Sequence, residues 1–441
     1  MIKQKHIMLL ALWALFWPSI SKGQTETPLP QQLTLEQCVE FALKNNPTVK
    51  QSLIDEEIGE REIKSSLSGW FPQISTTFGL DDNIKLRTQA IDGNLIAFGQ
   101  KYNSSLLLQV NQTLFNRDQL FASKSADNIR TGLTKNIEEV KISTAVNVSK
   151  AYYDILLTYE QLNILNENLS RLQKQYNDAR NRYESGLVDK TDYQRASISL
   201  SNVMSNRNRV KNSLDSKFFY LKQLMGFPQE QEFTLDYNYD LMEQQVFADT
   251  TETLSVENRV EYQFLENQVD LLNIQTNYEK WSYIPTLSAY YNYNWLFFNN
   301  DFSSLYEQSY PTSAVGLSLS LPIFQGGKRT QNIHIAELKE ERSQIDLINL
   351  RSQINTEYEG ALADYKSNYF EWQIIRENME MASEVYDIIK LQYDEGIKAY
   401  VDLIVAETEL RTAQLNHYNA IYQLLVSKLD LEKALGNIEI N

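Results

Sequence analysis

The chain is poor in cysteine, histidine, proline and glycine, the residues that form disulfides, bind metals or interrupt helices and strands. Its 441 residues include one cysteine, Cys38, so no disulfide can form within the chain. The three histidines, at positions 6, 334 and 417, are too few and too scattered for us to expect a metal site, a cofactor or a His-based catalytic site. With only 9 prolines and 15 glycines, the composition favours long uninterrupted elements.

Positive charge is also scarce. The chain has 57 Asp and Glu residues against 41 Lys and Arg residues, which gives a formal net charge of −16. Because a protein that neutralises phosphates needs a basic surface, we do not expect a nucleic acid partner. The acidic excess fits either a solubilising surface or an acidic lumen that prefers cations.

No apolar run in the sequence is long enough for a membrane helix, which needs about 20 residues. Residues 1–23 combine Lys3 and Lys5, an apolar stretch from Ile7 to Trp17 and small residues up to Gly23. This pattern predicts a secretory signal peptide. We therefore expect an exported protein whose membrane contact comes from something other than a helix.

Proline is absent between Pro72 and Pro228 and again after Pro322. In both regions apolar and aromatic residues recur every three or four positions, from Val148 to Tyr183 and from Ala361 to Tyr393. The spacing predicts coiled-coil helices over about 117–225 and 328–436.

The sequence repeats itself. The stretch RYESGLVDKTDYQRASISL (182–200) matches QYDEGIKAYVDLIVAETEL (392–410), so that Gly186 aligns with Gly396 and Asp192 with Asp402. Such self-similarity predicts two structural repeats, 24–230 and 253–441, joined by a linker at 231–252. The two aligned glycines are expected at the tips of helical hairpins.

Four short segments alternate apolar with small polar residues, at about 73–82, 102–115, 286–298 and 313–324. Each is about as long as a tilted membrane strand, and the first and third follow aromatic residues such as Trp70 and Trp281. Strands of a soluble sandwich alternate in the same way. Four of them in an exported chain favour a membrane β-barrel.

Four strands are too few to close a barrel, since the smallest membrane barrels have about eight. We therefore expect a mixed α and β membrane protein that closes its barrel with further copies of itself, surrounded by lipid. Gly326 and Gly327 are expected to turn the last strand into a long helix. Lys328 and Arg329 follow them and are expected at the wet edge of the membrane.

At this point the sequence resembles the TolC-type outer membrane efflux proteins, through LTLEQCVEFALKNNP, LSLPIFQGGKR, YESGLVDKTDYQRA, YDEGIKAYVDLIVAE and LDLEKALG. The resemblance implies a homotrimer with a 12-stranded barrel in the outer membrane, continued by an α-helical barrel in the periplasm. It also implies an exit duct for efflux or type I secretion that works with a periplasmic adaptor protein and an inner membrane pump.

The resemblance further implies a periplasmic gate at the far end of the helical tunnel. Asp402 takes the place of the family's first gate aspartate, so three copies would form a ring of carboxylates. The second gate aspartate falls on Val405 here, which leaves a second acidic ring unsupported. Thr191 and Asp192 match positions whose links to Lys398 and Tyr393 would hold the tip closed.

Two other classes of function can be weighed from the residues. QGGKRT resembles a phosphate-binding loop, but Arg329 stands where Ser or Thr is needed and the earlier glycine is missing. We therefore do not expect an enzyme. A secreted coiled-coil scaffold or adhesin would explain the helices and the signal peptide, although not the four strands of membrane length.

Overall fold

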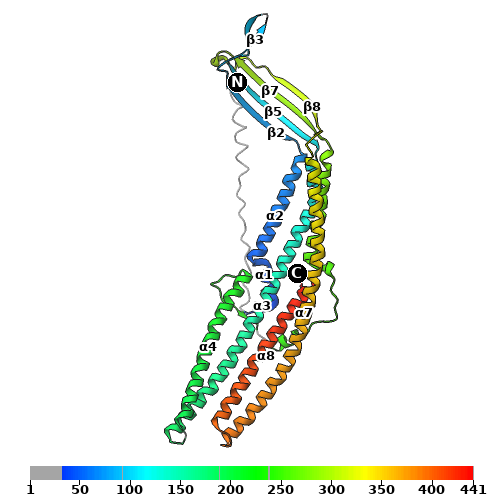
Figure 1. The fold of residues 1–441 in the computed structure, drawn as a ribbon. Helices are drawn as coiled ribbons and strands as arrows, with labels where there is room; N and C mark the ends of the chain where they lie inside the picture. Colours follow the sequence, from blue (N-terminus) through cyan, green and yellow to red (C-terminus); the bar gives the residue numbers. More distant parts are fainter. Residues whose placement is uncertain (1–31, 92, 188, 237–238, 441) are drawn as a thin grey trace, which may run out of the picture.

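The computed structural model describes residues 32–91, 93–187, 189–236 and 239–440. The expected signal peptide, residues 1–23, lies outside the described residues. The molecule is elongated, with a β-sheet at one end and paired helices at the other (Figure 1). No helix within the described ranges is both long and apolar enough to cross a membrane.

Two series of elements follow one another in the same order, which is helix, strand, strand, long helix and shorter helix. The first series is α2 (Pro47–Leu67), β2 (Gln73–Asp82), β5 (Tyr102–Phe115), α3 (Arg117–Glu184) and α4 (Lys190–Met225). The second is α6 (Val260–Lys280), β7 (Thr286–Asn299), β8 (Thr312–Ser320), α7 (Lys328–Asp394) and α8 (Tyr400–Leu435).

Shorter elements connect these series. They are β1 (Gln32–Leu33), α1 (Leu35–Asn45), η1 (Ser68–Trp70), β3 (Arg87–Ile91), β4 (Asn94–Phe98), β6 (Thr234–Leu235), α5 (Tyr239–Gln245), η2 (Val256–Asn258), η3 (Trp281–Tyr283) and η4 (Phe302–Ser304). Thr34 caps α1, because its hydroxyl accepts from the N–H of Gln37 and the Gln37 side chain accepts from the N–H of Thr34.

The main sheet is antiparallel with strand order β2-β5-β7-β8, so β2 and β8 are its edges. The register aligns apolar residues on one face, as in the row Ile74–Val110–Tyr291–Val315. The opposite face carries rows such as Ser75–Gln109–Asn292. The sheet therefore has one apolar and one largely polar face, as the alternation predicts.

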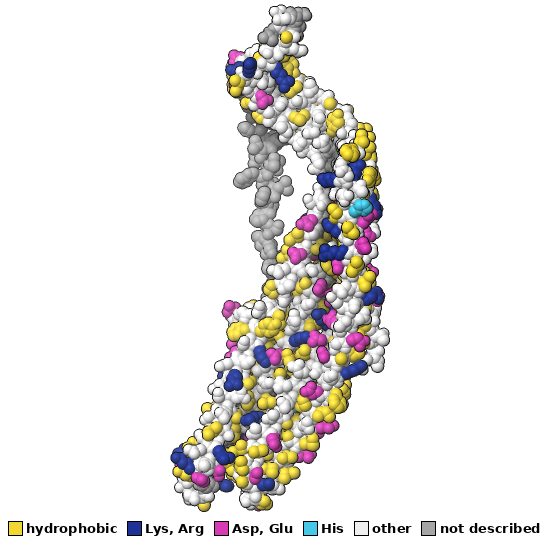
Figure 2. All heavy atoms as spheres, in the orientation of Figure 1, with side chains coloured by type: hydrophobic (Ala, Val, Ile, Leu, Met, Phe, Trp, Pro, Cys, Tyr) yellow, Lys and Arg dark blue, Asp and Glu magenta, His cyan; other side chains and the backbone are white. Residues whose placement is uncertain are grey.

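Exposed apolar side chains concentrate on the edge strands. Val315 is 81% exposed and Leu317 is 70% exposed on β8, while Ile74 and Phe78 are exposed on β2. Figure 2 shows apolar side chains along the outer side of the sheet where β8 lies. β8 ends at Ser320, before the expected boundary near residue 324, and residues 321–327 lead to α7 without regular structure.

The segment between β2 and β5 contains a hairpin made of β3 and β4. The two strands pair in antiparallel register from Arg87↔Phe98 to Ile91↔Asn94 and form a sheet of their own. Gly93 in the connection has φ +80°. The hairpin projects beyond the main sheet (Figure 1).

The helical part is long because nothing interrupts α3 and α7. They contain 68 and 67 residues, which corresponds to about 100 Å each at 1.5 Å per residue. In the middle of the molecule their inner faces pack with α1, α4 and α8 around one large cluster that includes Ile155, Leu221 and Leu424. Smaller clusters continue toward the hairpin tips, one around Leu172 and one around Leu403.

The two series are joined to their own hairpins in the same way. The residue preceding α2, Asn46, donates from its amide to the carbonyl of Leu224 near the end of α4 (2.6 Å). The residue preceding α6, Arg259, donates to the carbonyl of Ala434 near the end of α8 (2.9 Å). Both contacts satisfy a carbonyl that a helix end leaves open.

Residues 231–252, expected as a linker, contain β6 and α5 and pack against the helices. β6 pairs in parallel with β1, and the N–H of Ala248 donates to the hydroxyl of Tyr365 on α7 (2.8 Å). The same hydroxyl donates to the carbonyl of Val246 (2.9 Å). The segment is therefore anchored to the outside of α7.

Candidate functional site

The hairpin tips, where the gate is expected, are built identically in the two series. The N–H groups of Ser185, Gly186 and Leu187 donate to carbonyls four, three and five residues earlier, at 2.9 to 3.0 Å. Glu395, Gly396 and Ile397 repeat the same three bonds at 2.8 to 3.0 Å. Both tips need a glycine because Gly186 and Gly396 have φ +74° and +77°.

Tyrosine side chains hold the helices together above the tips. Tyr176 and Tyr193 share a hydrogen bond between their hydroxyls (3.2 Å), and the Tyr183 ring stacks on Tyr193 with centroids 5.9 Å apart. On the other hairpin, the rings of Tyr393 and Tyr400 lie 5.9 Å apart. Burial raises the pKa of Tyr400 above its ordinary value, so its hydroxyl stays protonated near neutral pH.

Asp402 lies in the first turn of α8 and is half-buried. Its carboxylate accepts a hydrogen bond from the N–H of Ala399 (3.2 Å), so within one chain it caps the start of its own helix. Val405, on which the resemblance places the family's second gate position, is exposed on the next turn. Lys398 and Thr191 are exposed at the two tips.

The expected links from Asp192 and Thr191 to Lys398 and Tyr393 do not form within the described part of one chain. No ion pair or hydrogen bond joins these side chains there. Tyr393 instead lies under the guanidinium of Arg182 from α3, 5.8 Å from the ring centroid. Burial raises the pKa of Tyr393, and the positive charge of Arg182 opposes that shift.

A buried polar cluster between α3 and α8 was not predicted from the sequence. Glu407 is 3% exposed, and its carboxylate accepts from Arg171 (3.1 Å) and from Gln175 (2.9 Å), both on α3. With its amide oriented to satisfy both neighbours, Asn168 donates to Glu407 (3.0 Å) and accepts from Arg411 (3.2 Å). The partners lie 232 residues or more apart, so no local pattern announces them.

The four long helices form a wall with the order α4, α3, α8, α7 (Figure 1). Neighbouring contacts join α4 to α3, α3 to α8 and α8 to α7. In one chain α4 and α7 are therefore the edges of the wall, just as β2 and β8 are the edges of the sheet. Exposed apolar residues follow α7 through its whole length, from Ile335 to Leu391.

The turn from β8 to α7 uses the two glycines expected there. Gly326 and Gly327 have φ +59° and +84°, a backbone region that favours glycine. Arg329 then folds back, donates to the carbonyl of Pro322 and lies 5.0 Å from the ring centroid of Tyr283. Lys328 begins α7 and is exposed. Basic and aromatic residues thus mark the boundary between sheet and helices.

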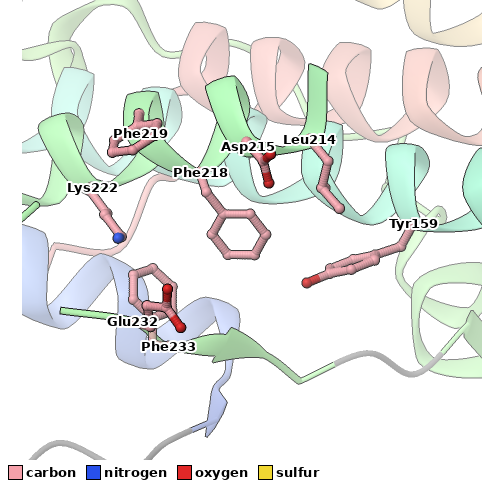
Figure 3. A pocket seen from close by; sticks show the side chains of 8 residues that line it. All are labelled: Tyr159, Leu214, Asp215, Phe218, Phe219, Lys222, Glu232 and Phe233. Atoms are coloured by element: carbon pink, nitrogen blue, oxygen red, sulfur yellow. The ribbon is translucent and has the colours of Figure 1, made fainter. Parts of the chain in front are cut away.

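One hollow on the surface lies between α3, α4 and the segment before β6. Its volume is about 520 Å³, and Figure 3 shows Phe218 between Tyr159 and Phe233 at its base. The ring centroids of these pairs lie 6.1 and 5.8 Å apart. Lys222 also lines the hollow, and its ammonium donates to the carbonyl of Gln229 (3.0 Å). These contacts attach the segment to the helices, and they do not form a catalytic set.

Within the described ranges no group of three or more His, Cys, Asp or Glu side chains is placed to hold a metal ion. Cys38 is buried, and burial raises the pKa of its thiol to about 12. It is therefore a small core residue and an unreactive thiol.

Comparison with known protein families gives one match over most of the chain. The family model described as outer membrane efflux protein matches residues 39–227 and 255–437. Outer membrane protein TolC of Salmonella enteritidis is 22% identical over 429 residues, covering 93% of this chain and 83% of the relative. Alkaline protease secretion protein AprF of Pseudomonas aeruginosa is 19% identical, covering 88% and 81%. Cation efflux system protein CusC of Escherichia coli is 21% identical, covering 67% and 65%.

Solved structures share the fold. Crystal structures of CusC superpose with a TM-score of 0.75 at 18% identity, covering 91% of both chains. The Campylobacter jejuni CmeC outer membrane channel superposes with a TM-score of 0.74 at 19% identity, covering 91% of this chain and 85% of the other. At these identities the likeness concerns the fold.

Proposed function

The chain belongs to the outer membrane efflux protein family, and from this premise we propose that it is the exit duct of a tripartite efflux or type I secretion system. It is an outer membrane protein that carries substrates outward. We place the sheet in the membrane and the helices in the periplasm, where a periplasmic adaptor protein and an inner membrane pump would meet the hairpin tips.

The observation that carries this proposal is that both the sheet and the helical wall end in unpaired edges within one chain. The sheet has unpaired edges at β2 and β8 together with a continuous apolar face. Unpaired backbone groups in hydrocarbon cost several kcal/mol each, so such a sheet is stable in lipid only when its edges meet other strands. The helical wall ends in the same way at α4 and α7.

Three copies close both structures at once. Four strands and four long helices per chain would make a barrel of 12 strands above a tube of 12 helices in a homotrimer. A 12-stranded barrel falls within the range known for outer membranes. The apolar face of each sheet would then meet lipid, and the polar face would line a water-filled lumen.

The duct would be passive. Its energy would come from the pump, and its own task would be to stay closed until an adaptor binds. Half-buried Asp402 lies at the tip, so three copies would place three carboxylates near the threefold axis and favour cations there. The relatives' names mention both cations and a protease, so they select no cargo for this chain.

Membrane fractionation tests the proposal against the alternative of a secreted scaffold or adhesin. We expect the protein to remain with the outer membrane until detergent is added, to migrate as a heat-modifiable trimer and to form channels in planar lipid bilayers. A protein recovered in the aqueous fraction that forms no channels would support the scaffold.

A further inference from the structure

The hollow of about 520 Å³ on α4 is lined by aromatic rings that a single chain does not cover. We name it the α4 hollow. Phe218 and Phe233 lie at its base (Figure 3), and Phe219, which also lines it, is 56% exposed. The hollow faces the side of the helices that carries segment 231–252, and α4 is an edge of the helical wall. Its exposed apolar lining therefore lies where another copy of the chain would arrive.

The internal repeat shows what covers the corresponding surface of α8. Gly226 and Gly436, the left-handed residues that end α4 and α8, align the two helices. Phe218 then corresponds to Lys428, whose ammonium donates to the carbonyl of Gln245 at the end of α5 (2.7 Å). The end of α5 thus lies on α8 at the level where α4 has its hollow.

An exposed aromatic ring is fixed to α7, the opposite edge of the wall. Phe247 follows α5, is 58% exposed and contacts the ring of Tyr369, with centroids 6.0 Å apart. Its neighbours in sequence, Val246 and Ala248, both bond to the hydroxyl of Tyr365. The backbone on either side of the exposed ring is therefore held against α7.

The contact between α3 and α8 predicts that this ring is level with the α4 hollow of the next copy. Lys150 of α3 pairs with Asp430 of α8 (2.6 Å), and the same alignment sets Gly360 of α7 opposite Tyr220 of the next α4. The two helices are antiparallel, so residues after Gly360, such as Tyr365, meet the residues before Tyr220 that line the hollow. This step rests on the proposed function, because that proposal supplies the ring of copies.

We propose that Phe247 of each chain packs into the α4 hollow of the next copy, so that three equal contacts form a belt around the outside of the helical tube. The occupant is a second copy of this chain, because α4 and α7 are the two edges that meet in the ring (Figure 1). Aromatic side chains that fill a pocket often carry much of the energy of an interface. Segment 231–252 is then part of the contact between copies as well as a connection between the repeats.

Thiol labelling of the assembled trimer tests whether the hollow is filled, since Cys38 is the only native cysteine and is buried. Phe219→Cys would be reacted with a bulky maleimide in detergent. We expect labelling at least tenfold slower than in the trimer that also carries Phe247→Ala, because the neighbour's ring no longer covers the thiol there. Equal labelling rates in the two trimers would overturn the inference.

Cross-linking identifies the occupant. Phe247→Cys with Phe219→Cys should be joined between chains by a short bifunctional methanethiosulfonate, which gives dimers and trimers on a denaturing gel that dithiothreitol removes. Phe247→Cys with Phe302→Cys is the matched control, since Phe302 is an exposed ring in the connection between β7 and β8. That pair should give no linked chains.

The outcomes separate the belt from the proposed function. Failure of Phe247→Cys with Phe219→Cys to link chains, in a protein whose native mass is that of three chains, would refute the belt and leave the proposed function standing. A wild-type protein with the mass of one chain that forms no channel would instead count against the proposed function.

A double-mutant cycle tests whether the two rings act on each other. Phe219→Ala and Phe247→Ala should each speed dissociation of the trimer in dodecyl sulfate about threefold or more. The combined variant should dissociate no faster than the faster single variant, because both changes remove the same contact. Phe302→Ala should leave the rate unchanged. Effects of the two changes that multiply in the combined variant would contradict a contact between the rings.

Discussion

At the scale of single residues, Asp402 is the side chain on which the cation preference of the tip depends. Asp402→Ala and Asp402→Asn should both raise conductance and weaken block by multivalent cations by about tenfold, because both remove the ring of charge. The asparagine variant would still offer an oxygen to the N–H of Ala399, whereas the alanine variant would not. If both variants change conductance and block equally, the effect comes from the lost charge and not from the lost helix cap. The measurement is titration of the blocking cation in planar bilayers.

Asp364→Ala serves as the control for this prediction, since Asp364 is an exposed acid on α7 far from the tip. It should leave the block unchanged. Wild-type block in both Asp402 variants would show that the carboxylates do not form a ring.

Because of His417, the stability of the protein should depend on pH in the mildly acidic range. It is buried on α8, and burial holds its pKa below the ordinary value, with Arg376 acting in the same direction and Glu380 against it. The unfolded chain therefore takes up the proton first, and stability present above pH 6.5 is lost as the pH falls. Urea unfolding in detergent should show a smaller free energy of unfolding at pH 5.5 than at pH 7.5.

His417→Leu should flatten this pH dependence, and His334→Leu should not, because His334 is exposed on α7. Parallel pH profiles for His417→Leu and the wild type would refute the assignment.

At the scale of elements, the hairpin tips depend on the left-handed backbone of their glycines. Gly396→Ala should lower the free energy of unfolding by about 1–2 kcal/mol, because an L-residue is strained at φ +77°. Gly360→Ala is the matched control inside α7, where an added Cβ meets open space. It should raise stability by up to about 1 kcal/mol. Chemical denaturation followed by circular dichroism measures both, and equal effects would contradict the account of the tips.

The two faces of the sheet should respond differently to charge. Leu317 lies on the apolar face of β8, and Ser318 is the next residue on the opposite face. Leu317→Lys should destabilise the membrane-inserted state by about 2–4 kcal/mol, whereas a lysine in the lumen at Ser318 is tolerated. The amount of heat-modifiable trimer in outer membranes reports this. Equal loss of trimer in both variants would mean that the two faces of the sheet do not contact lipid and water respectively.

Alternation and helical spacing were strong enough to place the main strands and long helices from the sequence. β2 and β5 cover the ranges that the alternation indicated. The β3–β4 hairpin was missed, although the Asp92-Gly93 pair in the sequence between the two strands is a known hairpin turn signal. β8 is shorter than expected because Pro322, which cannot donate to a ladder, follows its end.

The candidate site was harder to predict, for a physical reason. The tip glycines stood out because the repeat duplicates them. Glu407 did not, because a helical glutamate is ordinarily exposed and its burial depends on Arg171 of another hairpin. The link from Asp192 to Lys398 stays a prediction. The two side chains form no ion pair within the described part of one chain, and the direction of an exposed lysine is not encoded by spacing.

At the scale of the whole molecule, one chain is an incomplete object. Its sheet and its helical wall both end in edges that suit another copy, and the two pairs of edges lie on the same sides of the molecule (Figure 1). The internal repeat adds that the contact between copies should resemble the contact within one. Closure by copies is thus the central claim, and the duct follows from it.

The mass of the particle extracted from outer membranes tests this claim most directly. Native mass spectrometry of the detergent-solubilised protein should give a mass of three chains, with no stable monomer in detergent. A single chain that stays folded and dispersed in water without detergent would contradict closure of the sheet by its neighbours.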